Sequence, residues 1–163
     1  MNRKSVPIWI SIIQIAAITS IALVAGSTFG IWLGYNPLFY SASTFVEVHQ
    51  GAVKGLNFLL PAIAMTAIVC VIVLAYRIRR SGTPFYLYLL ALALIMSGGL
   101  ITRFINQPIN ADIVNWSPTS LPDGWQSVRN TWWTFHIVRT ISSITAMVLL
   151  IIAVLQDRSR NQT

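Results

Sequence analysis

The chain has little charge and little cysteine. Lys, Arg, Asp and Glu together make up 9% of its 163 residues, whereas soluble domains carry about 25%. Only four residues are acidic, and they are too few and too superficial to suggest a Ser/His/Asp triad. Cys70 is the single cysteine, which excludes a disulfide pair and a CxxC redox motif. The metal and haem patterns HExxH, DExxH and CxxCH are absent as well.

Long hydrophobic runs are what the chain has instead. Hydrophobic residues make up 55% of it, and they gather in four stretches that each reach the roughly 20 residues a helix needs to cross a bilayer. We therefore predict an all-α membrane protein: a single four-transmembrane-helix bundle over residues 1–163, with a long outer loop between the third and fourth helices. The stretches are Pro7–Tyr35, Leu56–Tyr76, Thr83–Thr102 and Trp132–Val154, and the predicted helices cover about 7–34, 43–77, 84–106 and 128–156.

The basic residues predict the orientation of the bundle. The first hydrophobic stretch is too long for the roughly 7–15-residue core of a signal peptide, so we expect a retained helix. Seven of the eleven basic residues then fall on the side that holds both termini, and the positive-inside rule places this side in the cytoplasm of a multi-pass cell-membrane protein. Charge at a membrane rim also argues against a nucleic-acid partner. The seven are Arg3, Lys4, Arg77, Arg79, Arg80, Arg158 and Arg160.

Polar residues recur at helical spacing in the outer half of the predicted helices. The interior of the cytoplasmic half of the bundle is expected to be apolar. An ionisable side chain inside a membrane usually faces a cavity or a partner, and bundles build their ligand sites between facing helices. We predict such a pocket, open to the outer face. The residues are Glu47, Gln50, Lys54 and Asn57; Arg103, Asn106 and Asn110; and Arg129, Trp133, His136, Arg139, Thr140 and Ser143.

Two other interpretations of these residues stay open. His49 and His136 lie on different helices at similar depth, where two imidazoles can ligate a haem b; with Glu47 they would instead form a single copper or iron site. Alternatively, Lys54, Glu47 and Arg103 form a buried ion-pair network that only fixes the register of the helices. The sequence therefore leaves three options for a cofactor: none, haem b or a single metal.

A specific pattern lies in the second half of the chain. It consists of Asn106-Gln-Pro-Ile-Asn110, then Trp116, then the run Trp132–Thr140 that contains Phe-His-Ile-Val-Arg-Thr. This pattern resembles the N-x-P-[LI]-N … W … [NF]-H-x-x-R-T signature of the anthrone-oxygenase-like four-helix membrane proteins, a family also described as a domain of unknown function. Helix number and loop lengths extend the likeness over nearly the whole chain.

The resemblance implies an activity and a set of site residues. Fungal members of the family are associated with the oxidation of an anthrone to an anthraquinone, an oxygen insertion without an obvious cofactor. Carried over by position, the residues that would line the pocket are Asn106, Asn110, Trp133, His136 and Arg139.

The candidate residues suit such chemistry. We expect His136 to be the general base that deprotonates a phenolic substrate, and Arg139 or Lys54 to stabilise the resulting anion. Trp116 and Trp133 would stack on an aromatic ring. The remaining predicted binding residues are Gln50, Asn57, Arg103, Asn106 and Asn110.

The leading hypothesis is therefore a small membrane oxidoreductase of the oxygenase type that acts on a lipophilic aromatic or quinone-like compound. The second is a haem- or metal-binding membrane subunit for electron transfer or docking to a larger complex, and the third is a structural or lipid-binding protein. The expected partners are the bilayer and a lipophilic small molecule. Gly26, Gly30 and Gly34 would let another helix approach closely, in this chain or in a homo-oligomer. The outer segment Gln107–Val128 has the length of a lid.

Overall fold

The computed structural model describes residues 6–79 and 82–160, so Arg3, Lys4 and Arg80 of the predicted basic rim lie outside the described residues. Within these two ranges the chain is helical and contains no strand. In chain order the elements are α1 (Ile8–Gly34), η1 (Pro37–Phe39), α2 (Ala42–Leu56), α3 (Leu59–Arg77), α4 (Thr83–Ile101), η2 (Thr102–Asn106), α5 (Gln107–Val114) and α6 (Trp125–Arg160).

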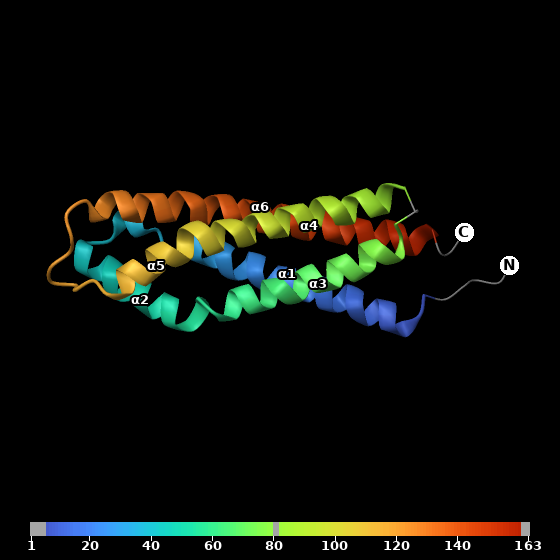
Figure 1. The fold of residues 1–163 in the computed structure, drawn as a ribbon, viewed down its shortest axis with the longest axis horizontal. Coiled ribbons are helices and arrows are strands. Elements are labelled where there is room, and N and C mark those ends of the chain that lie inside the picture. The colour runs from blue at the N-terminus through green and yellow to red at the C-terminus, as the bar shows by residue number, and fades with distance from the viewer. Residues whose placement is uncertain (1–5, 80–81, 161–163) are drawn as a thin grey trace.

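Four segments are long and apolar enough to cross a membrane, which confirms the predicted four-helix membrane protein. They are Ile8–Phe39, Leu59–Arg77, Thr83–Val114 and Trp125–Arg160. Figure 1 shows that α1 begins and α6 ends at the same end of the bundle, beside the turn from α3 to α4. At the opposite end, which we call the outer end, lie α2, α5 and the connection into α6. The side of the membrane that each end faces stays a prediction.

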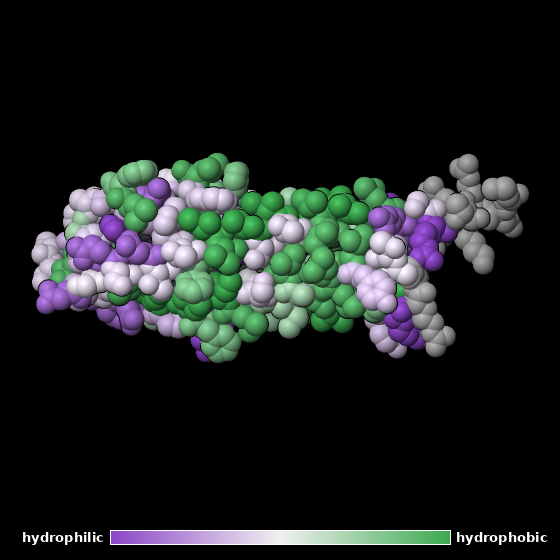
Figure 2. Space-filling view, turned by 90° about the horizontal axis from the view of Figure 1, so that it is seen from above, coloured by the Kyte–Doolittle hydropathy of each residue, from purple (hydrophilic) through white to green (hydrophobic). Residues whose placement is uncertain are grey.

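On the face shown in Figure 2, an apolar belt covers the middle of the bundle and hydrophilic residues concentrate at its two ends. Large hydrophobic side chains are exposed on every membrane-length helix, for example Ile15 on α1, Val69 on α3, Leu90 on α4 and Ile152 on α6. A continuous apolar surface of this extent marks contact with a membrane or a partner. We therefore expect the belt to lie in the hydrocarbon core of the bilayer.

Two clusters of buried hydrophobic residues hold the helices together. The larger cluster fills the half of the bundle that is nearer the termini, where fully buried alanines allow the helices to approach closely. These alanines are Ala17, Ala67, Ala91 and Ala146. The second cluster lies at the outer end and is rich in aromatic side chains. It includes Tyr35, Phe45, Trp132 and Trp133.

The predicted helix 43–77 is two helices, because Pro61 interrupts it. Proline has no N–H to donate to the carbonyl four residues earlier, which belongs to Asn57. The Asn57 carbonyl accepts instead from Gln107 Nε2 at 3.3 Å. The predicted kink is thus a complete break between α2 and α3, and α2 packs against α5 over the outer end.

The third predicted helix, 84–106, continues beyond its predicted end. α4 passes through one π-helical segment, η2, directly into α5, so the helical path reaches Val114 and the outer loop covers only residues 115–124. Within the π-helical segment the N–H of Gln107 donates to the carbonyl of Thr102. Pro108 follows, and its missing N–H prevents a regular α-helical ladder here. This wider turn holds Asn106 inside the bundle, where it is 1% exposed.

The half of the bundle nearer the termini is not wholly apolar, contrary to the prediction. Gln14 is buried in it and donates to Asp157 Oδ2 at 3.3 Å. Asp157 also pairs with Arg77, and Arg158 Nε donates to Gln14 Oε1 at 2.9 Å. This network joins α1, α3 and α6, which the sequence did not indicate because its members lie far apart along the chain.

The glycines Gly26, Gly30 and Gly34 on α1 and Gly98 on α4 differ in what they face. A Cβ added at Gly26, Gly30 or Gly34 would meet nothing within 4 Å in the described chain. The helix expected to pack on this stripe is therefore absent from the described residues, and contact with another subunit stays a prediction. Gly98 faces α6 instead, where an added Cβ would lie 3.8 Å from the carbonyl oxygen of Arg139.

Candidate functional site

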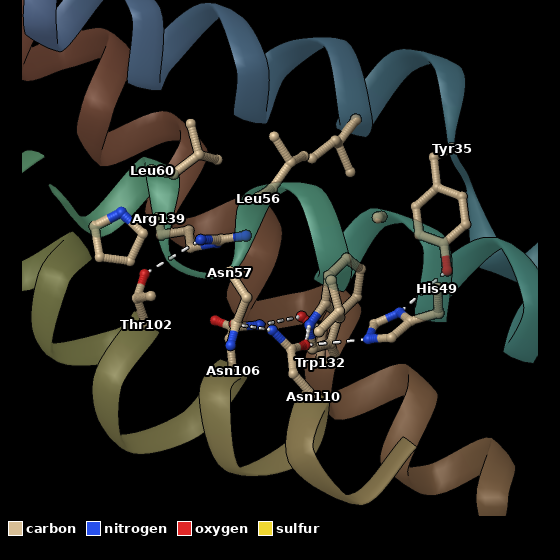
Figure 3. Close-up of a pocket in the computed structure, with 14 residues that line it drawn as sticks. Tyr35, His49, Leu56, Asn57, Leu60, Thr102, Asn106, Asn110, Trp132 and Arg139 are labelled. Carbon is tan, nitrogen blue, oxygen red and sulfur yellow. Dashed lines mark hydrogen bonds between the residues drawn. The ribbon is translucent and has the colours of Figure 1, made fainter. Parts of the chain in front are cut away.

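A small polar cavity of about 50 Å³ lies near the outer end of the bundle. It has room for only a few water-sized molecules. Figure 3 shows side chains from α2, α3, η2, α5 and α6, and from the end of α1, converging on it. Its polar lining residues are Tyr35, His49, Asn57, Thr102, Asn106, Asn110, Trp132 and Arg139.

His49 is fixed in one neutral form by its neighbours. Asn110 Oδ1 accepts from Trp132 Nε1 at 2.8 Å, and Asn110 Nδ2 donates to Asn57 Oδ1 at 2.8 Å. His49 Nε2 lies 3.1 Å from the same Oδ1 and must therefore carry its hydrogen. The other nitrogen, Nδ1, accepts from the Tyr35 hydroxyl at 3.2 Å. Burial lowers the pKa of His49 to about 4, against the opposing effect of the hydrogen bond to Asn110, so the ring is neutral at pH 7.

His136 is fully buried and positions Arg139. Its Nε2 lies 3.0 Å from the carbonyl oxygen of Thr28, which can only accept, so Nε2 carries the hydrogen. Its Nδ1 accepts from Arg139 Nη2 at 2.9 Å, and Arg139 Nη1 donates to Thr102 Oγ1 at 3.2 Å. The lone pair that a general base would use is therefore already bound to a guanidinium group.

Arg139 has no acidic partner in the described part of the chain. Glu47, Asp112 and Asp123 are exposed, and Asp157 belongs to the network at the opposite end of the bundle. The Nε atom of Arg139 is buried and makes no hydrogen bond with any described residue. An uncompensated buried charge is costly by several kcal/mol, so a guanidinium group held in this way points to an anionic ligand.

Asn106 offers an unused acceptor on the same cavity wall. Its Nδ2 donates to the backbone carbonyl of Trp132 at 3.1 Å, while its Oδ1 is buried and has no partner among the described residues. Buried polar atoms are nearly always hydrogen-bonded in proteins. Arg139 and Asn106, which both line the cavity, thus hold one donor and one acceptor that have no partner among the described residues.

Three aromatic rings stack beneath this cavity. The rings of Trp132 and His136 are nearly parallel, with centroids 5.0 Å apart, and Trp133 lies on His136 at 5.6 Å. Trp133 was expected to stack on a substrate, but it is 6% exposed and is not among the residues that line this cavity. Trp116, expected in the same role, packs against the aromatic cluster of the outer end.

A larger cavity of about 350 Å³ lies on the other side of Arg139, among α1, α3, α4 and α6. Its wall is mostly apolar, formed by residues such as Val24, Ala64 and Ile95. Four residues line both cavities: Leu60, Pro61, Thr102 and Arg139. The guanidinium group of Arg139 therefore stands where a polar chamber and an apolar chamber meet.

The predicted stripe on the second helix reaches the site only at Asn57, which lines the small cavity. Glu47 and Lys54 are exposed, because α2 crosses the outer end with Phe45, Val46 and His49 turned inward. Among the described residues no ion pair joins Glu47, Lys54 and Arg103, so the predicted register-fixing network does not form. The sequence prediction of one continuous helix over 43–77 had placed this stripe inside the membrane.

Gln50 and Arg103, two other predicted binding residues, occupy positions that the sequence did not indicate. Gln50 Nε2 donates to the backbone carbonyls of Ile113 at 3.1 Å and Trp116 at 3.0 Å, so it fastens the end of α5 to α2. Arg103 is exposed and lies at the edge of the larger cavity. The outer loop, residues 115–124, lines neither cavity, which gives no support to its expected role as a lid.

The described residues do not fit the haem or metal alternative. They contain no group of three His, Cys, Asp or Glu side chains that could hold a metal ion, and Glu47 is exposed. Both ring nitrogens of His49 and of His136 are engaged in hydrogen bonds. The Trp132 indole contacts both imidazoles, with centroids at 4.7 and 5.0 Å, and so occupies the space that a haem between them would need.

Several site residues were missed from the sequence. Trp132 lies four residues before His136 and Thr102 four residues before Asn106, so helical spacing offered a signal for both. No such signal existed for Tyr35, whose hydroxyl meets His49 only through the fold. The same holds for the Thr28 carbonyl that anchors His136.

Together these features define a class of protein: a four-helix membrane protein with a polar pocket near one end, on which stands an arginine with a buried Nε and no acidic partner in the described chain. Residues 51–149 match the family described as Anthrone oxygenase. The chain belongs to the anthrone oxygenase family, as its sequence motifs indicated. No curated protein and no solved structure matches it.

Proposed function

We propose that this protein is a small membrane oxygenase that oxidises a lipophilic, acidic aromatic compound of the anthrone type. The observation that carries the proposal is the buried guanidinium group of Arg139, which has no acidic partner in the described chain and stands at the junction of two cavities. Family membership supports oxidation as the reaction. A purely structural role would not explain why Arg139 Nε and Asn106 Oδ1 are buried without a hydrogen-bond partner among the described residues.

The reaction balances with dioxygen as the only co-reactant. The central CH₂ group of an anthrone loses two hydrogens and gains one oxygen atom, and the second oxygen atom leaves as water. Loss of a first proton gives an anion that is delocalised over the rings and the ring oxygen. The anion passes one electron to dioxygen, and the two radicals combine to form a C–O bond. The hydroperoxide then loses the second ring hydrogen as a proton while its O–O bond breaks, which yields the ketone and water.

Each site residue has a defined part in this scheme. Arg139 stabilises the substrate anion, and donors aimed at a developing oxyanion typically contribute about 10²–10³-fold in rate. His136 holds Arg139 in place through its Nδ1. Tyr35, His49 and Arg139 are the titratable residues on the wall of the small cavity. Of these, Tyr35 passes the proton to neutral His49. Its hydroxyl donates to His49 Nδ1, so it gives up this hydrogen as it takes the substrate proton, directly or through one water molecule.

The basic residues support an orientation for the site. Arg77, Arg79, Arg158 and Arg160 lie at the end of the bundle that is opposite the small cavity. By the positive-inside rule this end faces the cytoplasm. The oxidation site then belongs to the outer leaflet of the cell membrane, and the expected partners are the bilayer and a lipophilic substrate.

Turnover of a defined anthrone tests the proposal. Purified protein in liposomes that contain 1,8-dihydroxyanthrone should consume dioxygen and form 1,8-dihydroxyanthraquinone faster than protein-free liposomes. Arg139→Gln should lower kcat/KM by about 10²–10³-fold. Arg129→Gln is the matched control, since Arg129 lies on the same helix, contacts Asn130 and Trp125, and lines neither cavity. A wild-type rate equal to the background, or an unimpaired Arg139→Gln variant, would refute it.

A further inference from the structure

The larger cavity opens sideways, toward the lipid. Three of its lining residues are exposed large hydrophobic side chains: Met65 on α3, 59% exposed, and Met96 and Leu100 on α4, 47% and 55% exposed. They lie within the membrane-length segments Leu59–Arg77 and Thr83–Val114. A mouth with such a rim faces acyl chains and not water.

The two cavities differ in what they can hold. About 350 Å³ falls in the range of pockets that bind small organic molecules, roughly 300–1,000 Å³, and the wall is apolar apart from a few groups. The polar lining residues are Thr28, Thr102, Arg103, Gln107, Arg139 and Ser143. The small cavity, at about 50 Å³, holds dioxygen or water but no ring system.

Direct access from the outer end is obstructed. Above the small cavity, α2 is tied to α5 by the Gln50 bonds to Ile113 and Trp116 and by the bond of Asn110 Nδ2 to Asn57 Oδ1 at 2.8 Å. A flat aromatic molecule that came from water would have to break these contacts. The sideways mouth requires no such change.

We propose that the larger cavity is both the entry route and the binding site for the aromatic body of the substrate. A planar compound dissolved in the bilayer enters between α3 and α4, past Met65 and Met96, and its acidic oxygen meets Arg139. Dioxygen or water occupies the small cavity on the far side of the guanidinium group. This assignment rests on the proposed function for the identity of the substrate, and it adds where the substrate lies and from which phase it comes.

A substitution at Gly99 can reduce the free volume of the larger cavity. This glycine lines the cavity wall, and a Cβ added there would meet nothing within 4 Å. The variant Gly99→Leu therefore adds a side chain at the cavity wall, and its Cβ has no protein atom within 4 Å. Gly30 on α1 is also helical, exposed and free of neighbours within 4 Å, but it lines neither cavity. Gly30→Leu is thus the matched control.

The test measures binding separately from turnover. Wild type and variants in lipid nanodiscs are titrated with the non-reactive product, 1,8-dihydroxyanthraquinone. Protein-free nanodiscs give the background. We expect Gly99→Leu to raise Kd at least about tenfold, as loss of a few buried ring contacts would, and Gly30→Leu to leave it within about twofold. Met96→Trp, at the exposed rim, should slow the association of 1,8-dihydroxyanthraquinone with the protein. This variant replaces Gly99→Leu in the test if Gly99→Leu does not fold.

The outcomes distinguish this inference from the proposed function. Wild-type affinity in Gly99→Leu together with a wild-type association rate in Met96→Trp would overturn the lateral site, even if the anthrone were still oxidised. Absence of saturable binding to the wild type would overturn it as well. Binding that Gly99→Leu weakens, without any oxidation of 1,8-dihydroxyanthrone, would support the lateral site and refute the oxygenase.

Discussion

His136 and His49 occupy similar depths in the bundle but have different parts in the site. The carbonyl of Thr28 and the guanidinium group of Arg139 use both nitrogens of His136, so this residue positions a cation and does not transfer a proton. His49 meets only neutral partners at its ring nitrogens, Tyr35 and Asn110. In our proposal the substrate proton therefore reaches His49 through the Tyr35 hydroxyl, and not His136 as the sequence led us to expect.

The buried neutral state of His49 predicts a pH-dependent stability. Its folded pKa of about 4 lies below the ordinary value of 6.5, so the unfolded chain binds a proton more readily. The contribution of His49 to stability is complete above about pH 6.5 and declines as the pH falls toward 4, by up to about 3 kcal/mol. Thermal unfolding between pH 7.5 and pH 4.5 should show a steeper fall in Tm for the wild type than for His49→Gln. Parallel curves would contradict the assignment.

At the scale of elements, two prolines shape the site. Pro61 frees the Asn57 carbonyl for Gln107 and separates α2 from α3, and Pro108 follows the π-helical segment that holds Asn106 inside. The sequence predicted the position of the first interruption but not its consequence. Whether a helix bends or breaks at a proline depends on which distant group accepts or donates the freed hydrogen bond, and Gln107 is 50 residues away from Asn57.

Restoring the missing N–H at position 61 should change the course of α2. Pro61→Ala supplies a donor for the Asn57 carbonyl, which then competes with Gln107, so α2 and α3 should approach one continuous helix. Spin labels at the exposed positions Lys54 on α2 and Asp112 on α5, in a Cys70→Ser background, should move apart in this variant. An unchanged distance distribution would mean that the packing of α2 on α5, and not the proline, fixes the break.

At the scale of the whole molecule, the sequence predicted the architecture well and the site in part. Four long apolar runs are enough to identify four membrane-length helices, since few other structures satisfy the backbone in a bilayer. Asn106, Asn110 and Arg139 were found because helical spacing and family motifs agree there. Glu47 and Lys54 were misplaced, because periodicity assigns residues to a face of a helix but cannot tell that this helix crosses the outer end of the bundle with another face turned inward.

The orientation of the molecule is open to a direct labelling test. In a Cys70→Ser background, a cysteine at Asp123 in the outer loop should react with a membrane-impermeant maleimide on intact cells. A cysteine at Arg79, in the turn between α3 and α4, should react only after the cells are permeabilised. The reverse pattern would place the site on the cytoplasmic side.

The central claim is that Arg139 stabilises the anion of an acidic aromatic molecule, and the ionisation of a bound dye measures this directly. The visible spectrum of 1,8-dihydroxyanthraquinone reports its protonation, and a cation in contact with its oxygen should lower its ionisation midpoint by about 1–3 pH units. The account predicts a lowered midpoint with the wild-type protein in nanodiscs and a return to the protein-free value with Arg139→Gln. Equal midpoints for the wild type and Arg139→Gln would contradict it.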